Sequence, residues 1–137
     1  MDTEKIKRYF AALLIVLAID LTWVLVIAKP FYINELSGFA RPEIVPIWSA
    51  LLAWSLIPLG IVLFVDRVSK SNKQSLIYGA LFGFILYGVY DFTNYATLAN
   101  FTLTMVVVDI AWGTFLCSIS SFLLRFFLKS PDYKVSK

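Results

Sequence analysis

The chain contains four apolar stretches, each of a length that crosses a lipid bilayer. They are residues 9–28, 44–65, 76–96 and 103–128. A spanning α-helix needs about 20 mostly apolar residues to cross about 30 Å of hydrocarbon. Because lipid offers no hydrogen-bond partners, the backbone groups of such a segment must be satisfied within it. We therefore expect an all-α fold, an integral membrane four-helix bundle. Residues 1–137 should form a single four-span transmembrane domain with short connections and a longer external loop between helices 1 and 2.

The composition narrows the class further. Only 15% of the residues are charged, against about 25% in soluble domains, and the mean hydropathy is +0.80. The net charge of +3 comes from cations that flank the apolar stretches, where they set topology and do not indicate a nucleic-acid partner. With one cysteine, Cys117, and no histidine, an internal disulfide is excluded and zinc or haem has almost no donors. We predict no metal and no cofactor, with the lipid bilayer as the main partner.

Positive charge predicts the orientation. Ten of the 12 Lys and Arg residues lie near the N-terminus, between the second and third stretches, or at the C-terminal end. The other side carries only Lys29 and Arg41. Cationic connections stay in the cytoplasm, so we expect both termini there, in a bacterial inner membrane. The first stretch is too long for a signal peptide and contains Asp20, so we expect it to be retained.

The connection at residues 29–46 is the longest and combines three prolines with aromatic side chains. This mixture predicts a structured interfacial loop with one short helix at the level of the headgroups. Two interpretations are open: a lid, or an aromatic belt that anchors the loop. In the second stretch, Pro58 predicts a kink.

Three aspartates, Asp20, Asp91 and Asp109, lie within the apolar stretches. The one cation in those stretches, Arg125, lies 16 residues after Asp109, at the far end of the last stretch, and does not neutralise them. An aspartate at the centre of a spanning helix costs about 2.5 to 3.5 kcal/mol on insertion scales, and such residues mark functional sites. At about 1.5 Å per residue, all three lie about 8 to 12 Å from the same membrane boundary. The sequence therefore predicts one acidic pocket in the outer half of the bundle.

Helical spacing gives these acids polar and small neighbours. Gly79, Gly83, Tyr87 and Asp91 follow an i, i+4 row that begins with G-x-x-x-G, a pattern that allows close helix contact. Trp112 lies one turn from Asp109 on the last stretch. The candidate residues for binding a ligand or proton are Asp20, Asp91, Asp109, Asn94, Tyr87, Tyr90, Trp23 and Trp112.

Three interpretations of this site follow. The first is a membrane protein that binds or translocates a proton, a cation or a small polar ligand. The second is a lipid-modifying enzyme or accessory subunit that uses an aspartate as acid or base. The third is a structural partner protein whose acids cross-link helices, because indole, phenol and amide groups can donate to carboxylates. A homo-oligomer is compatible with each.

Enzyme motifs are scarce. Intramembrane aspartyl proteases carry a Gly-x-Gly-Asp signature, whereas three valines precede Asp109. The chain has no G-x-S-x-G, Walker or zinc motif. We therefore assign no catalytic residue and favour a protein that is not an enzyme.

Three blocks of sequence resemble one family. They are D-L-T-W-V-L-V-I-A-K-P-F-Y at residues 20–32, Y-G-V-Y-D-F-T-N-Y-A-T-L at residues 87–98, and V-D-I-A-W-G-T at residues 108–114. Nearly the whole chain is similar to a family of small bacterial predicted membrane proteins, domain of unknown function 2177. The resemblance implies a four-span inner-membrane protein and brings no reaction or ligand with it.

Overall fold

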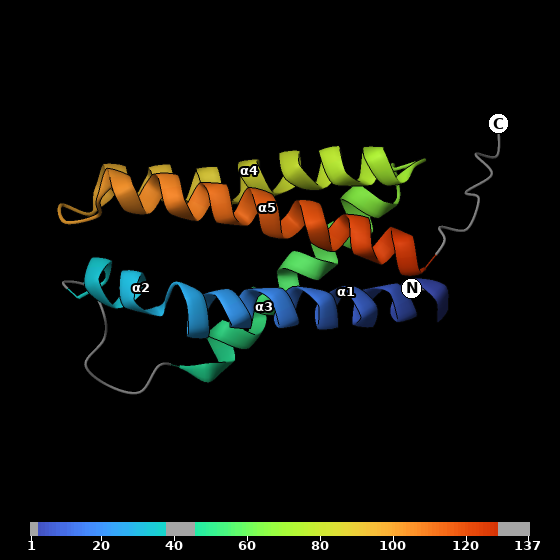
Figure 1. Cartoon of the computed structure of the whole chain (residues 1–137), viewed down its shortest axis with the longest axis horizontal. Helices are drawn as coiled ribbons and strands as arrows, with labels where there is room; N and C mark the ends of the chain where they lie inside the picture. Colours follow the sequence, from blue (N-terminus) through green and yellow to red (C-terminus); the bar gives the residue numbers. More distant parts are fainter. Residues whose placement is uncertain (1–2, 38–45, 129–137) are drawn as a thin grey trace.

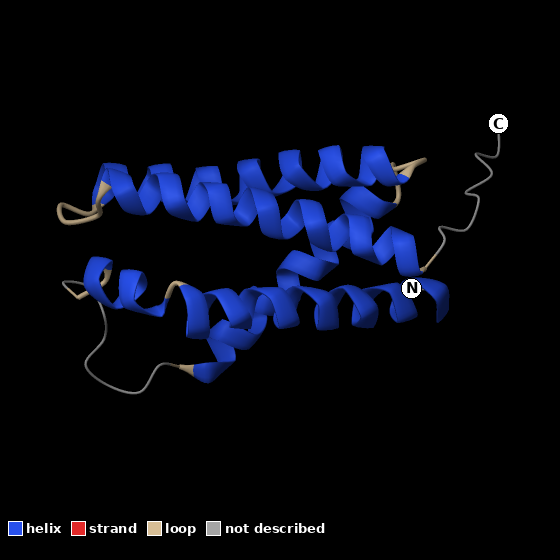
Figure 2. Ribbon diagram, viewed as in Figure 1, coloured by secondary structure: helices blue, strands red, loops and turns tan. Residues whose placement is uncertain are grey.

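The computed structural model describes residues 3–37 and 46–128. In this part of the chain all regular structure is helical, as Figure 2 shows. The elements are α1 (Thr3–Thr22), the π-helix η1 (Trp23–Ile27), α2 (Lys29–Glu35), α3 (Ile47–Gly60), the π-helix η2 (Ile61–Asp66), α4 (Asn72–Thr97) and α5 (Leu103–Phe127).

Four helical segments are long and apolar enough to cross a membrane. They are Thr3–Ile27, Ile47–Asp66, Asn72–Thr97 and Leu103–Phe127. The predicted all-α membrane bundle is therefore confirmed, and each predicted stretch corresponds to one segment. The first and third segments begin earlier than predicted because their polar first turns are helical too, although they add little hydropathy.

Figure 1 shows how the segments are arranged. The helices α4 and α5 run side by side in opposite directions, α1 lies along the bundle on the other side of α5, and α3 with η2 crosses obliquely between these layers. Side-chain caps fix where the pair begins. Ser71 accepts a hydrogen bond from the Gln74 amide at the start of α4, and Thr102 accepts one from the Met105 amide at the start of α5.

Glycines allow the close contact between α4 and α5. A Cβ atom on Gly79 would lie 2.5 Å from the carbonyl oxygen of Cys117, and one on Gly83 would lie 2.2 Å from the carbonyl oxygen of Gly113. These distances are too short for any side chain, because the opposing atoms belong to backbone. The predicted G-x-x-x-G contact is thus confirmed as the α4–α5 interface.

A buried ion pair joins three elements at the end of the bundle where α1 begins. Both carboxylate oxygens of Asp66, on η2, accept from Arg8 Nη1, at 3.0 and 2.9 Å. Arg8 Nη2 also donates to the carbonyl of Leu128, just after α5, at 2.7 Å. The helix becomes π-helical three residues after Pro58, which has no N–H for the α-helical ladder. This change of geometry brings Asp66 within reach of α1.

The short helix expected within residues 29–46 is present as α2, and residues 38–45 of that connection lie outside the described residues. In Figure 1, α2 continues roughly the direction of α1 and lies beside the start of α5. Its apolar side chains pack against a cluster at the start of α5. Phe31 and Tyr32 of α2, with Leu36 just after it, contact a cluster formed by Phe101, which precedes α5, and by Met105, Val106 and Ile110 of α5. We call this the α2 end of the bundle.

Candidate functional site

Asp20 is held by two indole groups. Its carboxylate, 6% exposed, accepts hydrogen bonds from Trp54 Nε1 of α3 and from Trp112 Nε1 of α5, each at 2.8 Å. Indole N–H is a donor without acceptor capacity, and each of the two bonds uses one oxygen of the carboxylate. Asp20 therefore links α1, α3 and α5, and both of its oxygens are satisfied.

Asp109 is held by a phenol from α2. The Tyr32 hydroxyl donates to Asp109 Oδ1 at 2.5 Å and accepts from Trp23 Nε1 at 3.3 Å. Trp23 in turn stacks on Trp112, with ring centroids 4.3 Å apart and planes 8° apart. Aromatic side chains thus connect the two acids through successive contacts, and α2 is tied directly to the site.

The protonation of Tyr32 is fixed by its surroundings. Burial raises the pKa of this phenol above its usual value, and the hydrogen bond to Asp109 raises it further. Tyr32 therefore keeps its proton at neutral pH and acts as the donor in the contact with Asp109.

Asp91 differs from the other two acids. It is 0% exposed, and in the described part of the chain neither carboxylate oxygen has a hydrogen-bond partner. A buried carboxylate without donors costs several kcal/mol in its charged form. Asp91 is therefore the one of the three acids whose oxygens have no hydrogen-bond partner among the described residues.

The register of α4 against α5 places Asp91 opposite Asp109. Contacts step by four residues along both helices in opposite directions, from Gly79 with Ser121 to Gly83 with Cys117 and Tyr87 with Gly113. The next step of this series pairs Asp91 with Asp109. Asp109 is close enough to interact electrostatically with both Asp91 and Asp20. We call Asp91 and Asp109 the acid pair.

Tyr87 lies one turn before Asp91 on α4 and packs against Gly113 of α5. A Cβ atom on Gly113 would fall 2.0 Å from the Tyr87 ring, so this glycine makes room for the ring against α5. Tyr87 is close enough to interact electrostatically with Asp20 and Asp109. Of the remaining candidates, Asn94 is half-buried one turn beyond Asp91 on α4. Tyr90 is 61% exposed, so the structure does not bring its side chain to the acids.

Two residues of the site were not predicted. Trp54 belongs to the oblique helix α3, and the sequence does not show at which height α3 crosses α1. Tyr32 follows Asp20 by 12 residues in the block 20–32, but only the packing of α2 against the start of α5 brings its hydroxyl to Asp109. Both are aromatic donors, the kind of group that a buried carboxylate requires.

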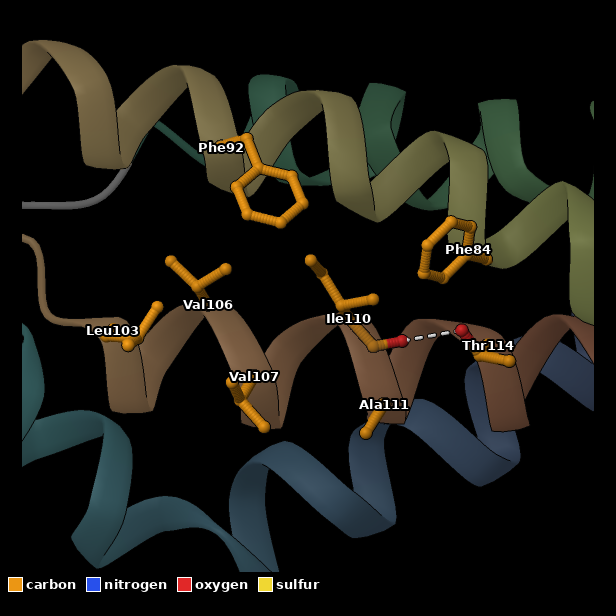
Figure 3. Close-up of a pocket in the computed structure, with 8 residues that line it drawn as sticks. All are labelled: Phe84, Phe92, Leu103, Val106, Val107, Ile110, Ala111 and Thr114. Carbon is orange, nitrogen blue, oxygen red and sulfur yellow. Dashed lines mark hydrogen bonds between the residues drawn. The ribbon is translucent and has the colours of Figure 1, made fainter.

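Two grooves with mainly apolar linings are formed by α4 and α5 residues. The groove drawn in Figure 3 has a volume of 490 Å³. It is lined by Phe84, Phe92, Leu103, Val106, Val107, Ile110, Ala111 and Thr114. The Thr114 hydroxyl is bonded to the carbonyl of Ile110 at 2.7 Å, as Figure 3 also shows. A second groove, of 620 Å³, shares Phe84 and Phe92. Such surfaces suit lipid chains and offer little to a charged ligand.

The donor set of the acid site is limited to carboxylates, phenols and indoles. Within residues 3–37 and 46–128, no three His, Cys, Asp or Glu side chains come together in a way that would hold a metal ion. The chemistry available is that of two facing carboxylates in apolar surroundings, which bind protons or positively charged groups.

Four long apolar helices define the class as an all-α integral membrane protein. Within that class, the model of one family, described as predicted membrane protein, domain of unknown function 2177, matches residues 5–125. The chain belongs to this family. No curated protein and no solved structure matches the chain.

Proposed function

We propose that the protein binds a proton or a small cation between Asp91 and Asp109 and carries it across the membrane. One observation supports this proposal above all others. Asp91 is fully buried and neither of its oxygens has a hydrogen-bond partner among the described residues. A bound proton, metal ion or ammonium group supplies the missing partner and removes the cost of burial.

The three acids take different parts in this proposal. Asp20 has two indole donors and fits the structural interpretation, a polar link between helices. Asp109 has one donor on one oxygen, which leaves its other oxygen for a ligand. Asp91 has none. The ligand would therefore bind at the acid pair, with Asp20 as a nearby fixed negative charge that favours a cation.

The charge pattern supports an orientation for the site. Ten of the 12 cations lie in the segments that contain the termini or join η2 to α4. By the positive-inside rule both termini would be cytoplasmic, in a bacterial inner membrane. The α2 end would then face outward, and the acid pair would lie closer to the outer surface.

Carbodiimide labelling tests the binding site directly. Dicyclohexylcarbodiimide enters apolar regions and reacts with protonated carboxyl groups, and mass spectrometry of the purified protein in nanodiscs locates the adduct. We expect labelling at Asp91, its loss in Asp91→Asn, and protection by Na⁺, K⁺ or methylammonium if a cation replaces the proton. Asp20, with its two indole donors, is the internal control and should remain unlabelled. Labelling at Asp20 with none at Asp91 would refute the assignment.

A further inference from the structure

We infer that α2 is a lid over the acid pair and that Tyr32 holds it closed through Asp109. This inference rests on the proposed function, because it states how access to the same site is regulated. Asp109 belongs to both the lid contact and the binding site. The Tyr32 hydroxyl donates to one oxygen of the carboxylate that a cation would bind through the other. A ligand on Asp109 therefore changes the charge that holds α2 closed.

The backbone before α2 has the features of a hinge. The chain leaves α1 through the π-helix η1, whose last hydrogen bond runs from the Ala28 amide to the Trp23 carbonyl at 2.7 Å. Ala28 has φ −97° and ψ 2°, outside helical values, and Pro30 in the first turn of α2 has no N–H to continue the ladder of α1. The helical hydrogen bonds of α1 therefore do not pass into α2, and α2 can pivot without unwinding α1.

Among the described residues, three side-chain hydrogen bonds hold α2 on the bundle. Tyr32 donates to Asp109 and accepts from Trp23 Nε1, and the Thr102 hydroxyl at the start of α5 donates to the Glu35 carboxylate at the end of α2. Apolar side chains of α2 also pack on the cluster that includes Met105, which is 5% exposed. Lifting α2 would expose this cluster together with Asp109.

The charge of Asp109 controls the strength of this closure. A phenol bonds more strongly to a carboxylate than to a carboxylate neutralised by a proton or a cation. The groups that face Asp109 from the packed elements are Asp20 of α1, Tyr32 of α2, and Asp91 and Tyr87 of α4. None of these is a cation, so the ligand itself is the positive charge that weakens the bond. Occupation of the acid pair then favours opening at the α2 end.

Thiol labelling tests the lid without any ligand. In a Cys117→Ala background, Met105→Cys places one thiol beneath α2, and its reaction rate with a water-soluble maleimide reports how often α2 lifts. Tyr32→Phe removes only the hydroxyl and should raise this rate about tenfold, the usual effect of losing a hydrogen bond to a charged group. Asp109→Asn should raise it as well. Leu116→Cys is the control, because Leu116 is also buried but lies in the core with Ala12 and Val16. Tyr32→Phe should not change the labelling rate of this thiol.

A second measurement needs no cysteine. Hydrogen–deuterium exchange of the α2 amides should be faster in Tyr32→Phe than in the parent protein, while exchange in α4 stays the same. The lid is refuted if Tyr32→Phe changes neither the labelling of Met105→Cys nor the exchange of α2. That result would leave the carbodiimide labelling of Asp91 untouched, so failure of the lid and failure of the binding site are separate outcomes. If the acid pair binds cations, methylammonium should raise both the labelling rate of Met105→Cys in the Cys117→Ala background and the exchange rate of the α2 amides in the parent protein.

Discussion

Trp112 donates its indole N–H to Asp20 at 2.8 Å although the two residues are 92 positions apart in the sequence. With the second indole, from Trp54, this bond leaves Asp20 fully satisfied inside the bundle. Asp91, also buried, has no such partner in the described structure. Two aspartates that look alike in the sequence therefore have opposite consequences for stability, and this difference can be measured.

Asp20→Asn should destabilise the protein by about 2 kcal/mol, because the new amide NH₂ replaces an acceptor oxygen and opposes an indole donor. Thermal unfolding in detergent measures the change. A double-mutant cycle with Trp54→Phe checks the cause. The double variant should lose less stability than the sum of the losses in the two single variants. Full additivity would mean that the Trp54–Asp20 bond does not contribute.

Asp91→Asn should leave thermal stability unchanged or raise it, since it removes a buried carboxylate without removing any hydrogen bond seen in the structure. The same unfolding assay compares it directly with Asp20→Asn. A loss of stability as large as that of Asp20→Asn would show that Asp91 is bonded within the fold.

Two glycines of α4 form a matched pair for testing the helix contact. Gly83→Ala places a methyl group against the backbone of α5 and should cost about 2 kcal/mol or more. At Gly88 an added Cβ atom would meet nothing within 4 Å, so Gly88→Ala should stabilise the helix by about 0.5 to 1 kcal/mol. Similar effects at both positions would place the α4–α5 interface elsewhere.

Removing one partner of the Arg8–Asp66 ion pair should destabilise the protein more than replacing both partners. Arg8→Leu leaves a buried carboxylate and should cost about 3 to 5 kcal/mol, whereas the double change Arg8→Leu with Asp66→Leu should recover much of that loss. Lys7→Ala removes the neighbouring exposed pair with Glu4 and is the control, with no measurable change expected. A double variant no more stable than Arg8→Leu would argue against this account of the pair.

The sequence predicted the parts of this structure that depend on local pattern. Hydropathy located the four long apolar helices, and the spacing of Gly79 and Gly83 predicted the α4–α5 contact. The sequence did not predict which side chains of other helices donate hydrogen bonds to the acids. Trp54 reaches Asp20 because α3 crosses obliquely, and Tyr32 reaches Asp109 because α2 packs on α5. Such contacts depend on crossing angles, which hydrophobic periodicity does not encode.

Arg8 is a second residue whose partner could not be predicted from the sequence. In the sequence it counts as one of the cations that set topology, yet in the structure it is 4% exposed and bonded to Asp66. The π-helical turn after Pro58 brings these two groups together. Local sequence indicates that Pro58 disturbs the helix, but it does not show which side chain the disturbance brings inward.

The most direct test of the central claim is ion flux in liposomes that contain only this protein. Wild-type protein should dissipate an imposed gradient of protons, Na⁺ or K⁺, read with a pH-sensitive dye or an ion-selective probe. Asp91→Asn should abolish the flux while remaining folded, and Gly88→Ala should preserve it. Flux through Asp91→Asn equal to that of the wild type, or no flux of any of these ions through the wild type, would contradict transport through the acid pair.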